Sequence, residues 1–241
     1  DNMEIGFEID MEKLNNFMQR RAPGKSKFTT KRKESDNINF ISGVRDNKII
    51  SKTITAIIKN ENYKSKDYEN LNDIPRPSHA DYTSFIKYGN EMDMNGGGPF
   101  SGRLTAPFCL AGGIAKQILE EKNIKISSRI KNIGGIEDKN IDLANPPMDE
   151  LEKISQKEIP VLDEKKEKDI RNLLEEVKND GDSVGGICQV FGENIPKGLG
   201  DPIFDSFEAK ISYLSYGIPA LRAVSFGLGL CLLYTSPSPR D

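Results

Sequence analysis

The sequence predicts an α+β fold, and three observations lead to that prediction. The expected strands and helices do not alternate regularly along the chain, which argues against a doubly wound α/β fold. One expected helix, which has Pro107 near its start and runs to about Glu121, is apolar on almost every side, as is typical of a helix buried between two layers. Hydrophobic residues make up 36% of the 241 residues, which is enough for a substantial core.

The first half of the chain is expected to hold a short helix, two strands and a long loop. Asp10 can cap a helix over residues 11–19, where apolar residues recur at helical spacing. Segments 39–43 and 48–59 are rich in Ile and Thr and predict strands. Residues 63–95 are polar and are expected to form a loop.

The second half predicts a mixture of strands and helices in irregular order. Asp163 is the expected cap of an amphipathic helix that runs to residue 178. Residues 138–160 are expected to be irregular. The remaining expected elements are strands at 124–133, 183–191 and 223–226 and a helix at 202–214.

Charge and cysteine content exclude several classes of protein. The formal net charge is −3, and the pI of about 5.5 argues against a dedicated nucleic-acid binder. Cys109, Cys188 and Cys231 form no CxxC pattern, so neither a disulfide framework nor a zinc site is expected, and no metal is assigned. No apolar run reaches the roughly 18 residues that a membrane span needs. We therefore expect a cytoplasmic protein with no membrane or nucleic-acid partner.

The two ends of the sequence are unusual. The chain opens at Asp1 without methionine, and residues 231–241 read CLLYTSPSPRD. Back-translated, this tail resembles a transposase-type sequencing adapter, although a native Pro/Ser-rich tail would look similar. We expect residues 1–230 to form part of a larger domain and residues 231–241 to be a sequencing artefact that does not belong to the fold.

His79 is the single histidine of the chain and a candidate proton donor. Imidazole can exchange a proton near neutral pH. Arg76 lies three residues before it and Asp81 two residues after it. A lone histidine in a loop is nevertheless more often structural than catalytic.

Three other segments suggest binding or catalysis, each with a plainer alternative. The basic run at 20–33 could bind nucleic acid or a small multi-anion, or form an ordinary solvated loop. The glycine-rich segment before the apolar helix could present backbone N–H groups to phosphate, or be a simple turn. Residues 181–185 fit GxSxG, but the expected helix precedes the serine and the strand follows it, which is the reverse of a hydrolase nucleophile elbow.

Taken together, these segments resemble the chorismate synthase family. The resemblance covers residues 1–229 and rests on several motifs in family order. Residues 20–30 read RRAPGKSKFTT, 76–83 read RPSHADYT, 96–106 read GGGPFSGRLTA, and 181–186 read GDSVGG. Shorter matches are SKDY at 65–68, KYG at 87–89, GLGDP at 198–202 and IPA at 218–220.

The resemblance implies a phosphate lyase. The family converts 5-enolpyruvylshikimate 3-phosphate to chorismate and phosphate by anti-1,4-elimination, a step in aromatic amino acid biosynthesis by the shikimate pathway. It requires reduced FMN without net redox change, and some members regenerate the flavin with NADPH. The cofactor then carries the difficult chemistry, and the protein supplies cations and proton donors. Members are homotetramers with a β-α-β sandwich.

The same resemblance assigns roles to individual residues. His79 corresponds to the histidine beside the reduced flavin. Three cations are implied to hold the phosphate and carboxylates of the substrate, at a position sometimes assigned to NADPH: Arg21, Lys27 and Arg76. Five residues are implied to contact the flavin: Pro99, Phe100, Ser101, Pro219 and Ala220. Lys27 stands where the family often has an arginine, and a lysine cannot make the bidentate contact that an arginine makes. Pro99 has no backbone N–H to donate.

The chain also departs from the family pattern. The N-terminal GESHG block with its second active-site histidine, a late Asn/Gly-rich flavin segment and the acidic C-terminal block are not found in it. We therefore expect the chain on its own to be inactive or nearly so. Two alternatives are a non-catalytic flavin- or anion-binding module, and a nucleic-acid-binding module built on residues 20–33, against which the acidic charge and few aromatic residues argue.

Overall fold

The computed structural model describes residues 2–24, 26–29, 34–60, 74–77, 79–89, 95–227 and 229. Its α-helices are α1 (Met11–Arg21), α2 (Asp81–Tyr88), α3 (Thr105–Glu121), α4 (Met148–Ile154), α5 (Glu164–Asn179) and α6 (Phe207–Ser215). Two 3₁₀ helices, η3 (Asn95–Phe100) and η4 (Gly102–Leu104), precede α3. The strands are β1 (Ile38–Ser42), β2 (Val44–Arg45), β3 (Lys48–Ile49), β4 (Thr55–Ile58), β5 (Lys125–Ile133), β6 (Ile136–Glu137) and β7 (Gly186–Glu193).

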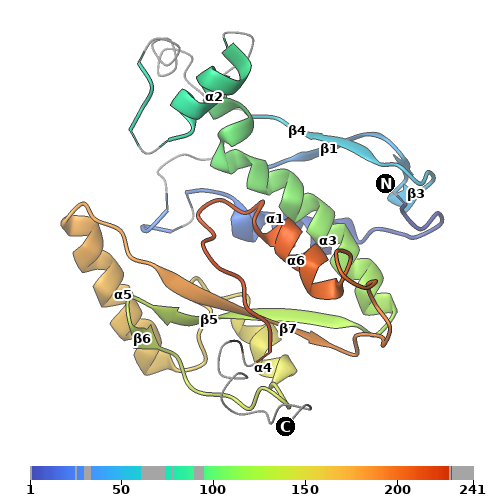
Figure 1. Cartoon of the computed structure of the whole chain (residues 1–241). Coiled ribbons are helices and arrows are strands. Elements are labelled where there is room, and N and C mark those ends of the chain that lie inside the picture. The colour runs from blue at the N-terminus through green and yellow to red at the C-terminus, as the bar shows by residue number, and fades with distance from the viewer. Residues whose placement is uncertain are drawn as a thin grey trace.

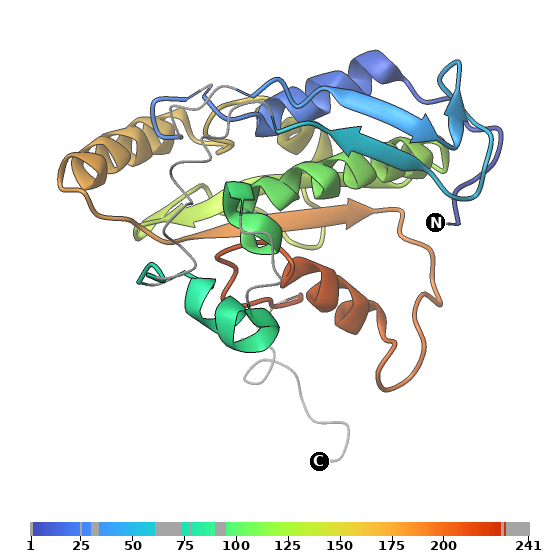
Figure 2. The ribbon, with the colours of Figure 1, turned by 90° about the horizontal axis from the view of Figure 1, so that it is seen from above.

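Helix α3 lies between two antiparallel β layers (Figures 1 and 2). One layer is the β1–β4 pair, and the other is a three-stranded sheet in the order β6–β5–β7. Helix α1 packs beside α3, whereas α5 flanks the β5–β6 end of the larger sheet (Figure 1). This arrangement confirms the predicted α+β class with a helix sandwiched between strands.

One core cluster joins α1, α3 and the β1–β4 pair. Leu14 and Met18 of α1 are buried against Leu110 and Ile114 of α3. The two helices approach closely at Gly113, where an added Cβ would lie 2.7 Å from Leu14 Cδ1. A glycine at this position therefore permits the close contact, at the expense of helix propensity.

The other face of α3 differs from the expectation of a helix buried on every side. The α3 residues Pro107, Phe108, Ala111 and Gly112 are exposed, and Phe108 keeps 51% of its accessible surface. Two smaller core clusters pack against the larger sheet, one around Leu151 of α4 with Phe191 of β7, and one around Ile170 of α5 with residues of β5.

Several local predictions are confirmed and several are wrong. The Asp10 and Asp163 side chains cap α1 and α5 by accepting backbone N–H groups. Helices α2 and α4 occupy segments expected to be loop or irregular; both are short and have no side-chain N-cap hydrogen bond, so local sequence signals are weak. The strand expected at 48–59 is interrupted between β3 and β4, the helix expected at 202–214 begins only at α6, and residues 223–226 form no strand.

None of the helices in the described ranges is both long and apolar enough to span a bilayer. Residues 25, 30–33, 61–73, 78, 90–94 and 230–241 lie outside the described part of the chain. Nothing is therefore said of the structure of parts of the basic run, the whole SKDY motif or the adapter-like tail at 231–241.

Candidate anion-binding site

A cavity of about 640 Å³ lies where the end of α1 meets the turns before α3. We call this cavity the arginine pocket, after the two arginines that line it, Arg21 and Arg103. Gly98 and Ser101 of the glycine-rich segment line it from the side of η3 and η4. Its volume lies within the usual range of small-molecule and cofactor sites.

Arg21 is held in place by two side chains. Its Nη1 atom donates to Asp36 Oδ2 at 2.5 Å, and its Nε atom donates to Thr105 Oγ1 at 3.3 Å. Asp36 is buried, with 6% of its surface exposed, whereas the Arg21 side chain keeps 19%. The guanidinium therefore contacts the first residue of α3 although it belongs to the last residue of α1.

Arg103 forms the second cationic wall of the arginine pocket. Its Nε atom lies 3.6 Å from Glu34 Oε1, and the Glu34 side chain is only 7% exposed. Glu34 and Asp36 both belong to the irregular segment that leads into β1. One short segment thus supplies a carboxylate to each of the two arginines.

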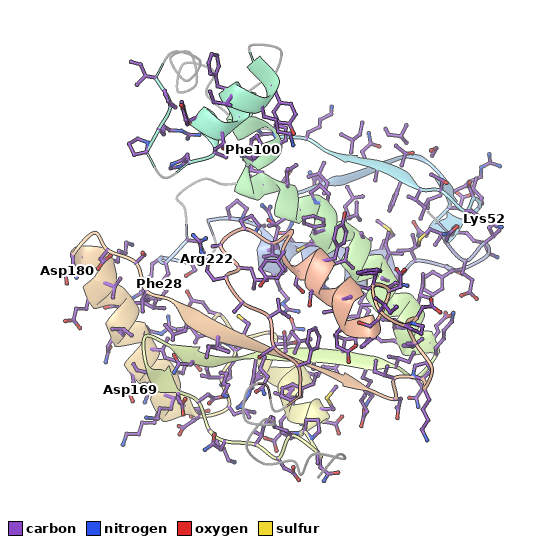
Figure 3. The ribbon with its side chains drawn as sticks, in the orientation of Figure 1. Phe28, Lys52, Phe100, Asp169, Asp180 and Arg222 are labelled. Carbon is purple, nitrogen blue, oxygen red and sulfur yellow. The ribbon has the colours of Figure 1, made fainter. Side chains whose placement is uncertain are left out.

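Ser101 shapes the turn that carries Arg103. Its hydroxyl oxygen accepts from the Arg103 backbone N–H at 3.3 Å and caps the 3₁₀ helix η4. Pro99 and Phe100 precede it in η3 and are exposed, Phe100 to 47%. Figure 3 shows Phe100 beside α2, at the start of the α3 segment.

Arg76 and His79 lie together in the turn before α2. The Asp81 carboxylate accepts from Arg76 Nε at 2.7 Å and from Arg76 Nη2 at 2.9 Å, which makes a bidentate ion pair. It also accepts from the Arg76 backbone N–H at 3.0 Å. The hydrogen bond from the Arg76 side chain is the main reason that the pKa of the Asp81 carboxyl lies below its ordinary value. Neither Arg76 nor His79 lines the arginine pocket.

The exposed His79 ring has a defined partner. Its Nδ1 atom lies 2.9 Å from the Pro77 carbonyl oxygen. Because a carbonyl oxygen can only accept, Nδ1 carries the hydrogen in this contact. The Nε2 atom is then left for a ligand, as an acceptor in the neutral ring and as a donor in the imidazolium form.

Lys27 points to a different part of the molecule. Its Nζ atom pairs with Glu175 of α5, and its backbone oxygen accepts from Lys178 Nζ at 2.6 Å. Phe28 lies near α5 in Figure 3, with Lys27 Nζ 5.3 Å from its ring centre. Lys27 therefore lines a second, broader cavity of about 1340 Å³ between α1 and α5, which Arg21 also lines, and Lys27 is not among the residues that line the arginine pocket.

Pro219 and Ala220 follow α6 and are exposed. They are not among the residues that line the arginine pocket. Ala220 has a φ of +66°, in the left-handed region that residues other than glycine rarely adopt. The structure thus brings Arg21 together with Ser101 in the arginine pocket and with Lys27 in the broader cavity. His79 with Arg76, and the Pro219–Ala220 pair, line neither cavity.

Sequence reasoning missed three charged residues that line the pocket, Glu34, Asp36 and Arg103. It also missed Thr105, which accepts a hydrogen bond from Arg21. Arg103 and Thr105 stand inside the quoted 96–106 motif, so the motif carried a signal for them. Glu34 and Asp36 follow a run of cations and look like ordinary surface charge in the sequence. Their burial is visible only in the fold.

The pocket fits the anionic part of a ligand. Arg21 and Arg103 offer guanidinium groups suited to phosphate or carboxylate, and the exposed Phe100 ring nearby in the chain could lie against a planar ring system. The described residues include no group of three or more His, Cys, Asp or Glu side chains arranged to hold a metal ion.

The chain is thus an α+β sandwich with an arginine-lined pocket beside a glycine-rich turn. The sequence profile of the family described as chorismate synthase matches residues 1–238. The chain therefore belongs to the chorismate synthase family, a family of lyases.

Individual relatives agree with this assignment. A chorismate synthase from Aliarcobacter butzleri is 40% identical over 230 residues, covering 95% of this chain and 62% of that protein. One from Lancefieldella parvula is 38% identical over 241 residues, covering 95% and 63%. A crystal structure of a chorismate synthase superposes with a TM-score of 0.73 at 27% identity, over 96% of this chain and 64% of the other. The chain spans somewhat over three-fifths of the length of these proteins.

Proposed function

We propose that this chain is the larger part of a chorismate synthase, which converts 5-enolpyruvylshikimate 3-phosphate to chorismate and phosphate. The reaction is an anti-1,4-elimination that belongs to the shikimate pathway of aromatic amino acid biosynthesis. Reduced FMN, when bound, supplies the electron density that assists C–O cleavage. The observation that carries this proposal is the arginine pocket, in which Arg21 and Arg103 face one cavity beside Ser101.

The residues of the chain would bind and orient the substrate. Arg21 would hold a phosphate or carboxylate in the arginine pocket, and Arg76 a second anionic group outside it. Preorganised cations of this kind stabilise a departing phosphate because they need no rearrangement as charge develops. The bidentate Asp81 contact keeps the Arg76 guanidinium oriented in the absence of ligand.

His79 would hold or deliver a proton beside the flavin. The Pro77 carbonyl orients the ring through Nδ1, so Nε2 is the atom that would face the ligand. Phe100, Ser101, Pro219 and Ala220 would contact the flavin, with Pro99 contributing shape but no N–H. Lys27 would need to leave Glu175 before it could bind substrate.

Further properties of the complete protein follow from the same proposal. We propose a homotetramer that acts in the cytoplasm on small molecules, with NADPH as a possible flavin reductant and with no nucleic-acid or membrane partner. The 241 residues alone are proposed to have little or no activity, because they contain one histidine and span about three-fifths of the length of their relatives. Chorismate formation by this chain above that of its His79→Ala variant would contradict this last point.

The lyase proposal can be tested in a chimera. Residues 1–229 of this chain would replace the matching part of the Aliarcobacter butzleri protein, to which the chain is 40% identical. Incubated anaerobically with reduced FMN and substrate, the chimera should release chorismate and phosphate in equal amounts, and its His79→Ala form should be slower by about 10²- to 10⁴-fold, the usual contribution of a proton donor. A folded chimera that binds FMN and substrate without turnover would instead favour the non-catalytic binding module.

A further inference from the structure

The buried carboxylate of Asp36 has no role in the proposed function, yet it contacts the principal cation of the arginine pocket. We propose that Asp36 is a positioning residue, which orients the Arg21 guanidinium so that Arg21 binds the anionic group of the ligand. This inference rests on the proposed function for the identity of that ligand. The contact itself, Arg21 Nη1 to Asp36 Oδ2 at 2.5 Å, is independent of it.

The first argument is the way in which the Arg21 donors are used. Asp36 takes Nη1 and Thr105 takes Nε, while Nη2 has no hydrogen-bond partner among the described residues. Arg21 lines the pocket, so Nη2 is available to a ligand there. An arginine can hold a carboxylate on one edge and offer another edge because its five donors are fixed in a plane.

The second argument is the backbone of Asp36. Its φ is +48°, in the left-handed region, and the residue is only 6% exposed. Asp and Asn tolerate this conformation better than other residues with a side chain, but it still costs free energy. A strained conformation that directs a buried charge at one arginine is typical of a functional position, where the surrounding structure holds the strain.

The third argument is electrostatic and makes the proposal testable. Removing a negative charge close to an anion site should strengthen anion binding if charge alone mattered. A positioning role predicts the opposite, since a disoriented guanidinium binds more weakly although the site has become more positive. The sign of the change in anion affinity therefore separates positioning from simple charge balance.

The experiment measures the Kd of inorganic phosphate for the 241-residue chain, without flavin, by isothermal titration calorimetry. Asp36→Asn should weaken phosphate binding by about tenfold. This is the lower end of the loss seen when residues that orient metal ligands are mutated. Asp46→Asn is the matched control, because Asp46 also has a φ of +48° but lies exposed in the turn between β2 and β3, outside the pocket. Its Kd should equal that of the unmodified chain.

The coupling to Arg21 is measured in a double-mutant cycle. In an Arg21→Gln background, Asp36→Asn should leave the phosphate Kd unchanged, whereas a merely structural Asp36 would lower affinity in both backgrounds. If Asp36→Asn does not fold, Thr105→Val removes the other support of Arg21 and should weaken binding about threefold, as expected for one hydrogen bond.

Tighter phosphate binding by Asp36→Asn, equal losses in both backgrounds, or no saturable phosphate binding by the unmodified chain would each overturn the proposal. If Asp36→Asn does not fold and Thr105→Val is used in its place, an unchanged phosphate Kd for Thr105→Val would also overturn the proposal. Because phosphate is the probe and no turnover is needed, a failed lyase assay leaves this result standing. Conversely, an active chimera with an uncoupled Asp36 would retain the lyase proposal and remove only the positioning role.

Discussion

Asp138→Asn is expected to destabilise the fold strongly, because Asp138 is the counter-charge of a buried arginine. The side chains of Arg129 on β5 and Asp138 are 2% and 0% exposed, and Arg129 Nη1 lies 3.1 Å from Asp138 Oδ2. Asp138 also accepts the backbone N–H groups of Leu162 at 3.0 Å and Asp163 at 3.0 Å. One carboxylate thus ties the larger sheet to the segment that caps α5.

The expected loss can be worked out from these contacts. An asparagine retains one oxygen for the backbone donors but leaves the Arg129 charge without a counter-ion, and breaking a buried pair in this way costs about 3–5 kcal/mol. In a domain of this size, a loss of 1 kcal/mol lowers Tm by about 2–4 °C. A loss of about 4 kcal/mol therefore corresponds to a fall in Tm of about 8–16 °C.

The assay is thermal and urea unfolding followed by circular dichroism, with Asp149→Asn as the control. Asp149 pairs with Lys125 on the same strand at 3.5 Å, but the two side chains are 84% and 44% exposed. Exposed pairs contribute about 0–1 kcal/mol. Equal losses for Asp138→Asn and Asp149→Asn would refute the reasoning, as would strict additivity when Arg129→Met, which removes the orphaned charge, is added to Asp138→Asn.

Two further predictions concern α3 and the turn before α2. Gly113→Ala should destabilise the fold by about 1–3 kcal/mol through overpacking, since the added Cβ would meet Leu14. Gly112→Ala, whose Cβ meets no atom within 4 Å, should stabilise the fold by up to about 1 kcal/mol. Chemical denaturation measures both changes, and equal effects would contradict the packing account. The pKa of Asp81 is depressed by Arg76, so the pair stabilises the fold fully above the ordinary aspartate pKa and loses its effect as pH falls through the folded pKa. The Tm difference between the unmodified chain and Asp81→Asn should therefore shrink on acidification, and a difference independent of pH would count against this assignment.

The sequence predicted correctly the starts of those helices that are capped by a neighbouring side chain. Asp10 and Asp163 were recognisable as caps because an aspartate before an apolar-periodic segment acts through its immediate neighbours. Helices α2 and α4 have no such cap, and α4 is held by distant residues. The α4 residue Leu151, for example, packs in a core cluster that includes Phe191 of β7.

The same distinction applies to the site. The motifs identified Arg21 and Ser101, which the fold does bring to one cavity. They could not show that Lys27 is paired with Glu175, because the two residues are 148 positions apart and no pattern in either segment links them. The burial of Asp36 was equally hidden, since a carboxylate after a basic run looks solvated until its surroundings are known.

Each cation that the family resemblance implies has a carboxylate partner: Arg21 with Asp36, Lys27 with Glu175, and Arg76 with Asp81. An anionic ligand must therefore share these cations or displace their partners. An arginine can bind both, because one edge of its planar guanidinium stays on the carboxylate while another edge binds the ligand. Lysine offers a single nitrogen, and that of Lys27 is engaged outside the pocket. Anion binding should consequently begin at the arginines, with Lys27 joining only after its contact with α5 is broken.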